Sequence, residues 1–371
     1  MEQWKEYQLG DLLNFRRGHD LPKSEMIAGD IPVAGSNGVI GFHNEATPIS
    51  PCITIGRSGN VGTPNFYEKC WAHNTVLYIN DFKENNPEFL FYLLKTIPLK
   101  SFGGGSAVPT LNRNHIHPIV VKSTKDIKLQ QKIVEILKSL DEKIELNRQI
   151  NDNLEQQAQA LFKSWFVDNK KDSWAVGRVS DFYDVTIGKT PPRKETQWFS
   201  SNCNDVTWVS ISDLGSCGMF INQSSEYLTP EAIKQFNVSI VPKGTVLLSF
   251  KLTIGRIAIS DVNLTTNEAI AHFRTDKDYL LEYTYLALKD YQFSTLGSTS
   301  SIATAINSKI IKSMEWIMPF DEDLKGFHAL VNPIFEQIKT NITEINNLTQ
   351  LRDTLLPRLM SGELKINEIN C

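Results

Sequence analysis

The feature that most constrains the fold is a long stretch, residues 129–168, that contains neither glycine nor proline. It is rich in Leu, Ile, Lys, Glu and Gln, which favour helices or suit a helix surface. Its apolar residues recur in alternating steps of four and three, the spacing of a heptad seam that a partner helix must cover. The seam consists of Ile133, Leu137, Leu140, Ile144, Leu154, Ala158, Leu161 and Trp165, with Asn147 and Asn151 in the two remaining places. Asp126 precedes the stretch and is placed to cap the helix.

A second seam of the same spacing lies 194 residues further along the chain, so that Ile133 corresponds to Phe327. Its members are Phe327, Val331, Ile334, Ile338, Asn341, Ile345, Leu348, Leu355 and Leu359, and only Arg352 breaks the apolar match. Asn147 and Asn341 fall at the same place in the two seams, where a buried asparagine costs stability but fixes register or pairing. We expect the two helices to pair. Two unrelated core helices are the alternative, because any two heptad patterns align in some register.

The segments that precede the two helices repeat in the same order. Residues 9–13 resemble 179–183, the Thr-Ile-Gly-Arg segment 54–57 recurs at 253–256, His73 and Asn74 resemble Thr266 and Asn267, 89–95 resemble 283–289, and Leu111 and Asn112 resemble Ile306 and Asn307. A two-copy repeat of this size indicates a duplicated domain, since a solenoid needs three or more short units. The expected parts are a first domain (1–125), a central helix (126–168), a second domain (169–322) and a C-terminal helix with a tail (323–371).

The expected fold class is α+β, with two mixed α/β globular domains related by a pseudo-two-fold axis and separated by two long antiparallel coiled-coil helices. Dense glycine, proline and asparagine punctuation in the first domain predicts short strands, among them 31–33, 52–55 and 76–79. A proline followed by an apolar run predicts a helix over residues 87–96. Because a helix rises about 1.5 Å per residue, we expect helices of this length to hold the two domains at a fixed distance from each other.

Composition narrows the class of protein. The net charge is −4, and residues 1–125 carry 12 Lys and Arg against 11 Asp and Glu, so no strongly basic nucleic-acid binder is indicated. No run of 18 apolar residues predicts a membrane span, and residues 1–10 lack the apolar core of a signal peptide. The five cysteines are too widely spaced for a zinc site or a disulfide framework. We expect a cytoplasmic protein that could hold DNA only with cations gathered on one face or supplied by a partner.

The sequence contains no complete motif of catalysis or metal binding. Gly188, Lys189 and Thr190 resemble the end of a phosphate-binding Walker A loop, but the glycine required five residues earlier is Tyr183. His115 and His117 could ligate a metal, yet no Cys/His cluster accompanies them. The signatures Gly-x-Ser-x-Gly and His-Glu-x-x-His do not occur. We therefore expect neither a catalytic residue nor a metal site in this chain.

The order of these features resembles the specificity subunit of Type I restriction-modification enzymes over essentially the whole chain. The resemblance is carried by the two seams, the paired Thr-Ile-Gly-Arg segments, the Gly/Ser-rich stretches before Leu111 and Ile306, and the closing residues 355–362. No single motif is specific to that family, whereas the ordered set, occurring twice, is. The resemblance implies that each domain is a target recognition domain that reads one half of a bipartite DNA site. It also implies that the helices fix the spacer and dock methyltransferase subunits.

The same resemblance implies a set of partners. These are double-stranded DNA, two adenine-N6 methyltransferase subunits that use S-adenosylmethionine, and restriction (translocase-endonuclease) subunits that use ATP and Mg. The chain itself would bind none of these cofactors and would carry no catalytic residue. Two alternatives remain open from the residues alone. One is a two-headed adaptor on a coiled-coil strut that does not bind DNA, and the other is a free-standing DNA-modifying enzyme with an unrecognised site.

Reading DNA requires side chains that hydrogen-bond to base edges, together with cations or N–H groups that contact phosphates. In the first domain the candidates are Arg16, Arg17, Lys23, Ser36, Asn37, Arg57, Ser58, Asn60, His73 and Asn74. In the second they are Lys189, Arg193, Lys194, Lys251, Arg256, Thr266 and Asn267. Arg57 and Arg256 stand out because each ends a Thr-Ile-Gly-Arg segment; the alternative is a structural turn followed by a surface charge. Residues 103–105 indicate a hinge rather than a phosphate cradle, because the second domain has no matching glycine run.

Overall fold

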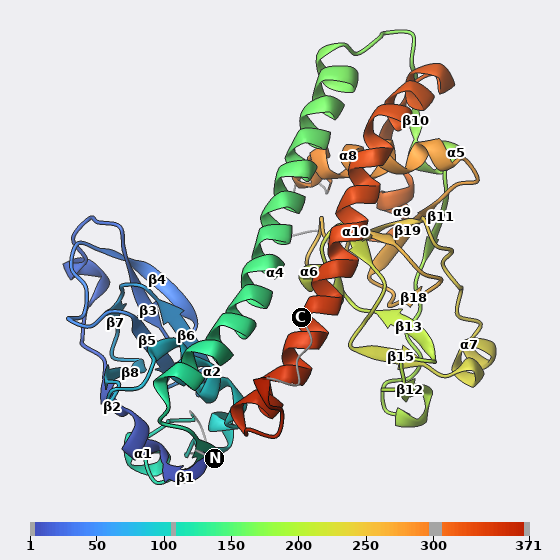
Figure 1. Cartoon of the computed structure of the whole chain (residues 1–371). Helices are drawn as coiled ribbons and strands as arrows, with labels where there is room; N and C mark the ends of the chain where they lie inside the picture. Colours follow the sequence, from blue (N-terminus) through green and yellow to red (C-terminus); the bar gives the residue numbers. More distant parts are fainter. Residues whose placement is uncertain (1–3, 105–108, 297–305, 367–371) are drawn as a thin grey trace. The chain divides into compact units, whose positions relative to one another are not determined.

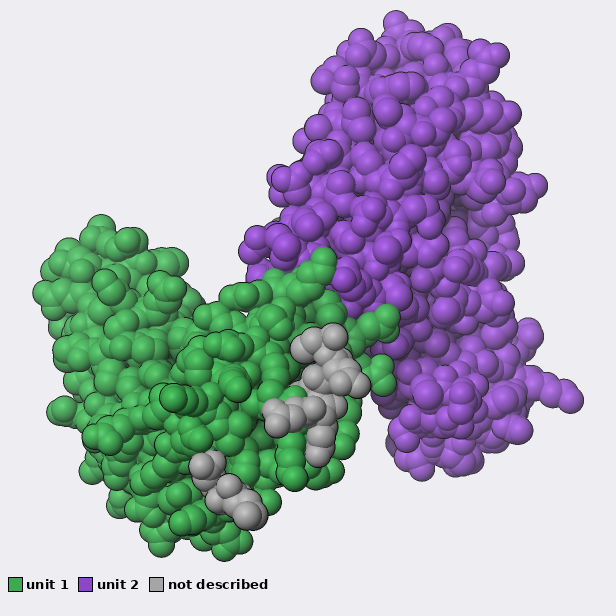
Figure 2. All heavy atoms as spheres, in the orientation of Figure 1, with its two compact units in different colours: residues 1–144, 347–371 green, residues 145–346 purple. Residues whose placement is uncertain are grey.

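The computed structural model describes residues 4–104, 109–296 and 306–366, which fold into two compact units (Figures 1 and 2). Unit 1 consists of Met1–Ile144 and Asn347–Cys371, and unit 2 consists of Glu145–Asn346. Each unit therefore contains one globular part and a portion of each long helix. Gly105, Cys371 and much of the two Gly/Ser-rich stretches (residues 105–108 and 297–305) lie outside the described residues.

Unit 1 contains a four-stranded sheet, a three-stranded sheet and a two-stranded sheet. The first is antiparallel, in the order β2 (Asn14–Arg17), β8 (Val76–Asp81), β5 (Cys52–Gly56) and β6 (Pro64–Tyr67). The second has the order β4 (Gly38–His43), β3 (Ile31–Gly35) and β7 (Trp71–Ala72), while β1 (Lys5–Gln8) pairs with β9 (Val120–Ser123). The three strands predicted from the sequence are confirmed as β3, β5 and β8. All of β5 is buried, which suits a central strand with β-branched residues.

Short helices complete unit 1: α1 (Leu9–Leu12), α2 (Pro87–Thr96) and α3 (Arg113–Ile116), with the 3₁₀ turns η1 (Lys23–Glu25) and η2 (Leu99–Phe102). The predicted helix is confirmed as α2, with the same bounds. Asn86 caps it by accepting a hydrogen bond from the Phe89 N–H (3.1 Å), and Pro87 occupies its first turn. The apolar face of α2 shares one core with Ile133 and Leu356 of the two long helices.

Unit 2 contains a five-stranded and a four-stranded sheet. The first has the order β11 (Asp184–Ile187), β19 (Ile270–Arg274), β16 (Val246–Ser249), β17 (Ile257–Ser260) and β14 (Phe220–Ile221); the second has the order β12 (Phe199–Ser200), β15 (Glu226–Leu228), β13 (Val206–Val209) and β18 (Thr265–Thr266). β10 (Ala175–Arg178) pairs with β20 (Glu315–Met318). The helices are α5 (Val179–Phe182), α6 (Ile211–Ser216), α7 (Pro230–Phe236), α8 (Leu281–Asp290) and α9 (Ser308–Lys312), with the 3₁₀ turns η4 (Thr196–Trp198), η5 (Asp278–Leu280) and η6 (Phe293–Thr295). The element order parallels that of unit 1, and the fold class is α+β as predicted.

The two seams lie on long helices that stand out in Figure 1. The first is α4 (Ile127–Phe162), which continues into a π-helical segment, η3 (Lys163–Asp168), and the second is α10 (Asp321–Met360). Asp126 caps α4 as predicted, because its carboxylate accepts hydrogen bonds from the Lys128 N–H (2.9 Å) and the Leu129 N–H (3.2 Å).

The portions of α4 and α10 that belong to unit 2 run antiparallel. Near the middle of α4, Asn147 contacts Glu344, whereas at the end of α4 the Phe162 ring lies 6.4 Å from the ring of Phe327, close to the start of α10. The C-terminal end of α4 therefore lies beside the N-terminal end of α10. The predicted pairing of the two helices is present in this unit.

The strand register corrects one correspondence expected between the two domains. In unit 1 the Arg57 N–H donates to the Thr75 carbonyl oxygen (2.8 Å), directly after β5. In unit 2 the matching bond runs from the Phe250 N–H to the Ala269 carbonyl oxygen (2.9 Å), directly after β16. Phe250 therefore occupies the position of Arg57, and the expected match of Arg57 with Arg256 is wrong.

The second Thr-Ile-Gly-Arg segment lies in the loop after β16. The Gly62 N–H donates to the Gly56 carbonyl oxygen (2.9 Å), and the Gly255 N–H donates to that of Ser249 (3.1 Å), so residues 253–256 match residues 60–63. Gly62 and Gly255 share a left-handed backbone, with φ of 75° and 88°. Four residues do not fix a conformation by themselves. The cross-strand hydrogen bonds decide whether they form a strand or a loop.

A second expected correspondence is displaced by one residue. The His73 N–H donates to the Ala34 carbonyl oxygen (3.0 Å), and the matching bond in unit 2 runs from the Asn267 N–H to the Val209 carbonyl oxygen (3.0 Å). His73 therefore corresponds to Asn267 and not to Thr266. Both residues begin the turn into the strand that pairs with β5 or β16.

Candidate nucleic-acid interface

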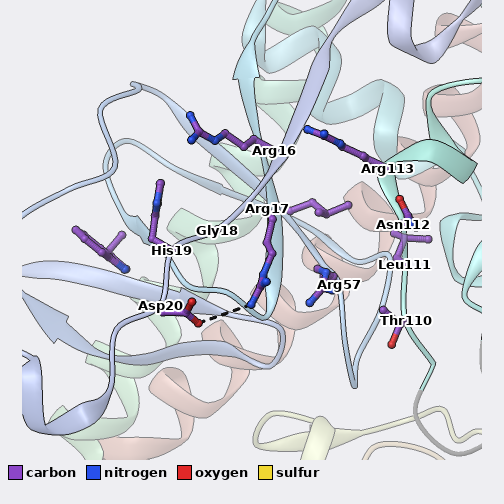
Figure 3. A pocket seen from close by; sticks show the side chains of 12 residues that line it. Arg16, Arg17, Gly18, His19, Asp20, Arg57, Thr110, Leu111, Asn112 and Arg113 are labelled. Carbon is purple, nitrogen blue, oxygen red and sulfur yellow. Dashed lines mark ion pairs between the residues drawn. The ribbon is translucent and has the colours of Figure 1, made fainter.

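A basic hollow of about 770 Å³ opens on unit 1, where β2 and β5 end (Figure 3). It is lined by Arg16, Arg17, Gly18, His19, Asp20, Arg57, Trp71, Leu77, Thr110, Leu111, Asn112 and Arg113. Four of these residues are arginines and one is an aspartate, although the chain as a whole is weakly acidic. The structure thus gathers cations on one face, which the overall charge does not indicate. Such a surface attracts the phosphates of a nucleic acid.

Gly18 makes this hollow possible by letting the chain pass close to a neighbouring turn. A Cβ at this position would lie 2.1 Å from the His73 carbonyl oxygen and 2.5 Å from that of Ala72. The approach is held by backbone bonds from the Gly18 N–H to the Val76 oxygen (3.0 Å) and from the His19 N–H to the Ala72 oxygen (2.8 Å). The end of β2, which carries two of the arginines, is fixed in place as a result.

Backbone hydrogen bonds also position Arg57. Its N–H donates to Thr75, and its carbonyl oxygen accepts from the Leu111 N–H at 2.7 Å. The neighbouring Ser58 forms a β-bridge with Thr110. The loop after β5 is therefore tied to the segment that enters α3, and the two segments place arginines from distant parts of the sequence in one hollow.

The guanidinium groups of the hollow have little competition from carboxylates. Arg17 lies 3.7 Å from Asp20, but both side chains are exposed, and such pairs contribute little. Among the described residues, Arg16, Arg57 and Arg113 form no ion pair. A guanidinium in this situation can bind a phosphate or the O6/N7 edge of guanine with two hydrogen bonds.

The other seven candidates of the first domain are not among the residues that line the hollow. Lys23, Asn37 and Asn60 are exposed, and Ser36, Ser58, His73 and Asn74 are half-buried. The Asn74 side chain hydrogen-bonds to Asp20, and His73 Nδ1 lies 3.1 Å from the Thr75 hydroxyl. Burial lowers the pKa of His73, an effect that Asp20 opposes, so this ring adds no fixed positive charge near neutral pH.

Two basic candidates in unit 2 are held by contacts within the protein. Arg193 donates to both carboxylate oxygens of Glu226 (3.0 and 2.8 Å), and its guanidinium lies over the rings of Phe199 (4.4 Å) and Trp208 (4.3 Å). Lys189 donates to the Phe236 carbonyl oxygen at 2.6 Å.

Arg256 is also engaged in an internal contact. Its guanidinium donates to the Ile211 carbonyl oxygen at 2.6 Å, and it packs so closely on Gly215 that a Cβ there would lie 2.3 Å from Nη1. The side chain holds α6 to the loop after β16. Lys194 and Lys251, by contrast, are exposed.

Thr266 and Asn267 support the turn into β19. Thr266 is buried, and its hydroxyl lies 2.7 Å from Nε2 of His272, while the Asn267 side chain accepts from the Ala269 N–H at 3.1 Å. His272 contacts Thr186 through its other ring nitrogen (2.9 Å), and burial lowers its pKa to about 3. The ring is neutral at pH 7 and links two strands.

Nine of the twelve residues that line the hollow were not among the candidates chosen from the sequence, and these nine include His19, Thr110, Asn112 and Arg113. Asn112 caps α3 by accepting from the Asn114 N–H at 2.9 Å, which orients the following Arg113. The sequence did contain a signal for Arg113, because the two residues before it, Leu111 and Asn112, belong to the repeated segments. The arginine that directly follows this repeated pair carries the charge that the sequence reasoning missed.

The seam residues of the helices all lie in protected positions. Ile133, Leu137, Ile144, Asn147, Phe327, Val331, Ile338 and Asn341 are buried, and Leu140, Leu154, Leu161, Ile334, Leu348 and Leu355 are half-buried. Asn147 and Asn341 are 1% and 5% exposed, so both are core residues. Asn147 donates to Glu344 (2.7 Å) and Asn341 donates to Asn151 (2.8 Å) across unit 2.

In unit 1 the same two helices are joined by a charged contact. Arg352, which breaks the apolar seam, donates to Asp141 at 2.7 Å. The Tyr92 hydroxyl donates to the other oxygen of that carboxylate at 2.8 Å. Burial, and then the hydrogen bond to Asp141, raises the pKa of Tyr92 far above its usual range, so the phenol remains protonated. Arg352 therefore contributes to the contact between α4 and α10, although it breaks the apolar seam.

The described part of the chain shows no metal centre. No cluster of three or more His, Cys, Asp or Glu there could hold a metal ion. His117 accepts a hydrogen bond from the Phe15 N–H through Nε2 (3.1 Å), and His115 is exposed. None of the described helices is long and apolar enough to cross a membrane.

Comparison with known proteins identifies relatives of this chain. The family described as Type I restriction modification DNA specificity domain matches residues 1–156 and 171–347. The chain is 26% identical over 360 residues to the Type I restriction enzyme HindI specificity subunit of Haemophilus influenzae, across 75% of this chain and 77% of that protein. It is 28% identical over 312 residues to the Type I restriction enzyme MjaIX specificity subunit of Methanocaldococcus jannaschii, across 76% and 70%.

A solved structure shares the fold. It is the crystal structure of a Type I restriction-modification system S subunit from M. genitalium, with a TM-score of 0.59 and 14% sequence identity. The similarity covers 96% of this chain and 96% of that chain. At this identity the likeness concerns the fold alone.

Proposed function

Since this chain belongs to the family of Type I restriction modification DNA specificity domains, we propose that its two units read the two halves of a bipartite DNA target. The chain is a DNA specificity subunit of a Type I restriction-modification system, a recognition subunit without catalysis of its own. The comparisons do not favour a two-headed adaptor that leaves DNA alone. Base recognition then depends on the side chains that each unit presents to the grooves and phosphates of the DNA.

The observation that carries the proposal is the basic hollow of unit 1. Arg16, Arg17, Arg57 and Arg113 line a concave surface together with Asn112 and Thr110. Arginine pairs with guanine through two hydrogen bonds, and asparagine does so with adenine, while the remaining cations hold phosphates. The hollow therefore combines both kinds of contact that a half-site requires. Residues 1–125 are the recognition domain in this proposal.

The second half-site is read by residues 169–322, with different side chains. Lys194 and Lys251 are exposed cations, whereas Arg193 is paired with Glu226 and Arg256 donates to the Ile211 carbonyl oxygen. Phe250 replaces the arginine found at position 57. Two recognition surfaces with different chemistry read different base sequences, as a bipartite target without internal symmetry requires.

The long helices set the distance between the half-sites and dock the partners. Their pairing is specified by buried asparagines at 147 and 341, which hydrogen-bond across unit 2. The proposed partners are two methyltransferase subunits, which bring S-adenosylmethionine for adenine-N6 methylation, and restriction subunits that use ATP and Mg. The assembled complex acts on DNA in the cytoplasm.

The experiment that tests this function is methylome sequencing of cells with and without the gene. The expected result is one bipartite motif, with adenine methylation in both half-sites, that is present only when the gene is present. An identical methylome in the two strains, while the methyltransferase subunits are expressed, contradicts the proposal.

A further inference from the structure

Leu252, in the loop after β16, combines two features that seldom occur together. Its side chain is fully exposed to solvent, and its backbone has φ of +61°. A positive φ is rare for residues with a bulky side chain, because the Cβ approaches the following carbonyl oxygen. The Thr253 N–H donates to the Lys251 carbonyl oxygen (2.6 Å), which closes a tight three-residue turn around Leu252.

A buried serine, Ser249, stabilises this turn through hydrogen bonds. The Ser249 hydroxyl donates to the Thr253 carbonyl oxygen (2.7 Å) and accepts from the Arg256 N–H (3.0 Å). Ser249 has no exposed surface, and its carbonyl oxygen accepts from the Gly255 N–H at 3.1 Å. A residue stays in a strained conformation only where its surroundings impose it. Leu252 is therefore presented by a fixed turn.

The matching position of unit 1 shows the ordinary solution for this turn. Gly59 lies two residues after Arg57, as Leu252 lies two residues after Phe250, and its φ is +82°. Glycine adopts such a backbone without strain. In unit 1 this loop adjoins the basic hollow, since Arg57 lines it. Unit 2 holds an exposed leucine where glycine would be more stable.

We propose that Leu252 is a base-reading contact of the second recognition domain, and that its side chain packs on the C5-methyl group of a thymine in the major groove. This inference rests on the proposed function, because it requires unit 2 to bind DNA. The thymine methyl is the apolar group among the base edges of that groove. Leucine has no hydrogen-bonding side chain, so it distinguishes bases by this methyl group.

The surroundings of Leu252 favour DNA over a protein partner. Its neighbours on the turn, Lys251 and Thr253, are exposed and polar, while Phe250 is buried. A docking site for a protein would need a contiguous apolar patch, whereas a single apolar tip beside an ammonium group suits one base edge next to a phosphate. Lys251 is placed to bind that phosphate.

The test uses the full chain in complex with its methyltransferase subunits. The variants are Leu252→Gly, which fits the backbone, and Leu252→Asn, which tolerates positive φ but is polar. Ile240→Ala, at another exposed apolar residue of unit 2, is the matched control. DNA affinity is measured on the target identified by methylome sequencing, with each thymine of the second half-site replaced in turn by uracil, which lacks the methyl group.

The expected result is that uracil at one position weakens wild-type binding about fourfold, the effect of one buried methyl group. The same replacement should have no effect on either Leu252 variant, and Ile240→Ala should behave like the wild type. Variants that bind and discriminate as the wild type does overturn the inference. So does a variant that loses its methyltransferase subunits instead of DNA affinity. If the wild-type complex itself shows no sequence preference, the proposed function fails.

Discussion

The side chain of Asn147 on α4 donates a hydrogen bond to the Glu344 carboxylate on α10 at 2.7 Å. The bond lies within unit 2 and crosses the helix pair. Asn341, which occupies the same place in the second seam, donates to Asn151 at 2.8 Å. Each asparagine of the repeat therefore contacts the opposite helix.

Replacing Asn147 should weaken the helix pair. Asn147→Ala removes a buried hydrogen bond, which should lower the free energy of unfolding by about 1–3 kcal/mol. Urea unfolding of the full chain measures this difference. Gln156→Ala, on an exposed position of the same helix, is the control and should change stability by less than about 0.5 kcal/mol. Equal stabilities of the two variants would show that the asparagine does not support the pairing.

Removing single arginines from the basic hollow should affect the first half-site only. Arg57→Ala or Arg113→Ala should cost roughly 1–3 kcal/mol and relax the base preference at one position if the side chain contacts a base. If it contacts a phosphate, all sequences should weaken alike and the salt slope should fall by about one. Binding titrations at several salt concentrations distinguish the two. Lys132→Ala, an exposed cation on α4, serves as control; unchanged affinity for both arginine variants contradicts the role of the hollow.

Arg256 should behave as a structural residue. Arg256→Ala leaves the Ile211 carbonyl without its charged donor, so the free energy of unfolding should fall by about 1.5–3 kcal/mol. Preference among second half-site sequences should stay unchanged. Thermal unfolding and competition binding test the two statements separately, with Lys234→Ala, at an exposed cation on α7, as the control. A stable Arg256→Ala protein with a relaxed half-site would assign this arginine to DNA after all.

The buried His272 should make the protein less stable in acid. Its pKa is lowered from 6.5 to about 3 in the fold, so the unfolded chain binds one more proton between these values. Stability is then present above pH 6.5 and falls as the pH drops toward 3, by up to about 1.4 kcal/mol per pH unit. His272→Gln removes the titrating group, and its stability should depend less on pH in this window. Parallel pH profiles for both proteins would exclude His272 as the cause.

Lengthening the first helix should change the spacer of the DNA target. One heptad inserted near Asn147 preserves the phase of the seam and adds about 10.5 Å of helix. DNA rises about 3.4 Å per base pair, so the spacer should lengthen by up to about three base pairs while both half-sites stay the same. A four-residue insertion breaks the phase and should destabilise the pair. Methylome sequencing measures both the half-sites and the spacer. Altered half-sites with the original spacer would contradict the proposal that the helices set the spacer length.

Local signals of the sequence determined the long helices and α2. These signals act within a few residues, so the helices could be predicted from them. They are the heptad spacing of α4, the Asp126 cap, and the Asn86 cap followed by Pro87 in the first turn of α2. The duplication was visible for the same reason, because matched seams keep their spacing in both copies. Local structure of this kind depends on neighbours along the chain.

Tertiary structure decided which residues correspond and which cations gather. Arg57 matches Phe250, and not Arg256, because hydrogen bonds to β8 and β19 set the strand register, and those strands lie further along the sequence. Arg113 joins Arg16 in one hollow because Gly18 admits a close backbone approach and Thr110 bridges to Ser58. The sequence by itself determined the periodic helices and the two-copy plan. The recognition surface depends on contacts between distant segments, which no short motif encodes.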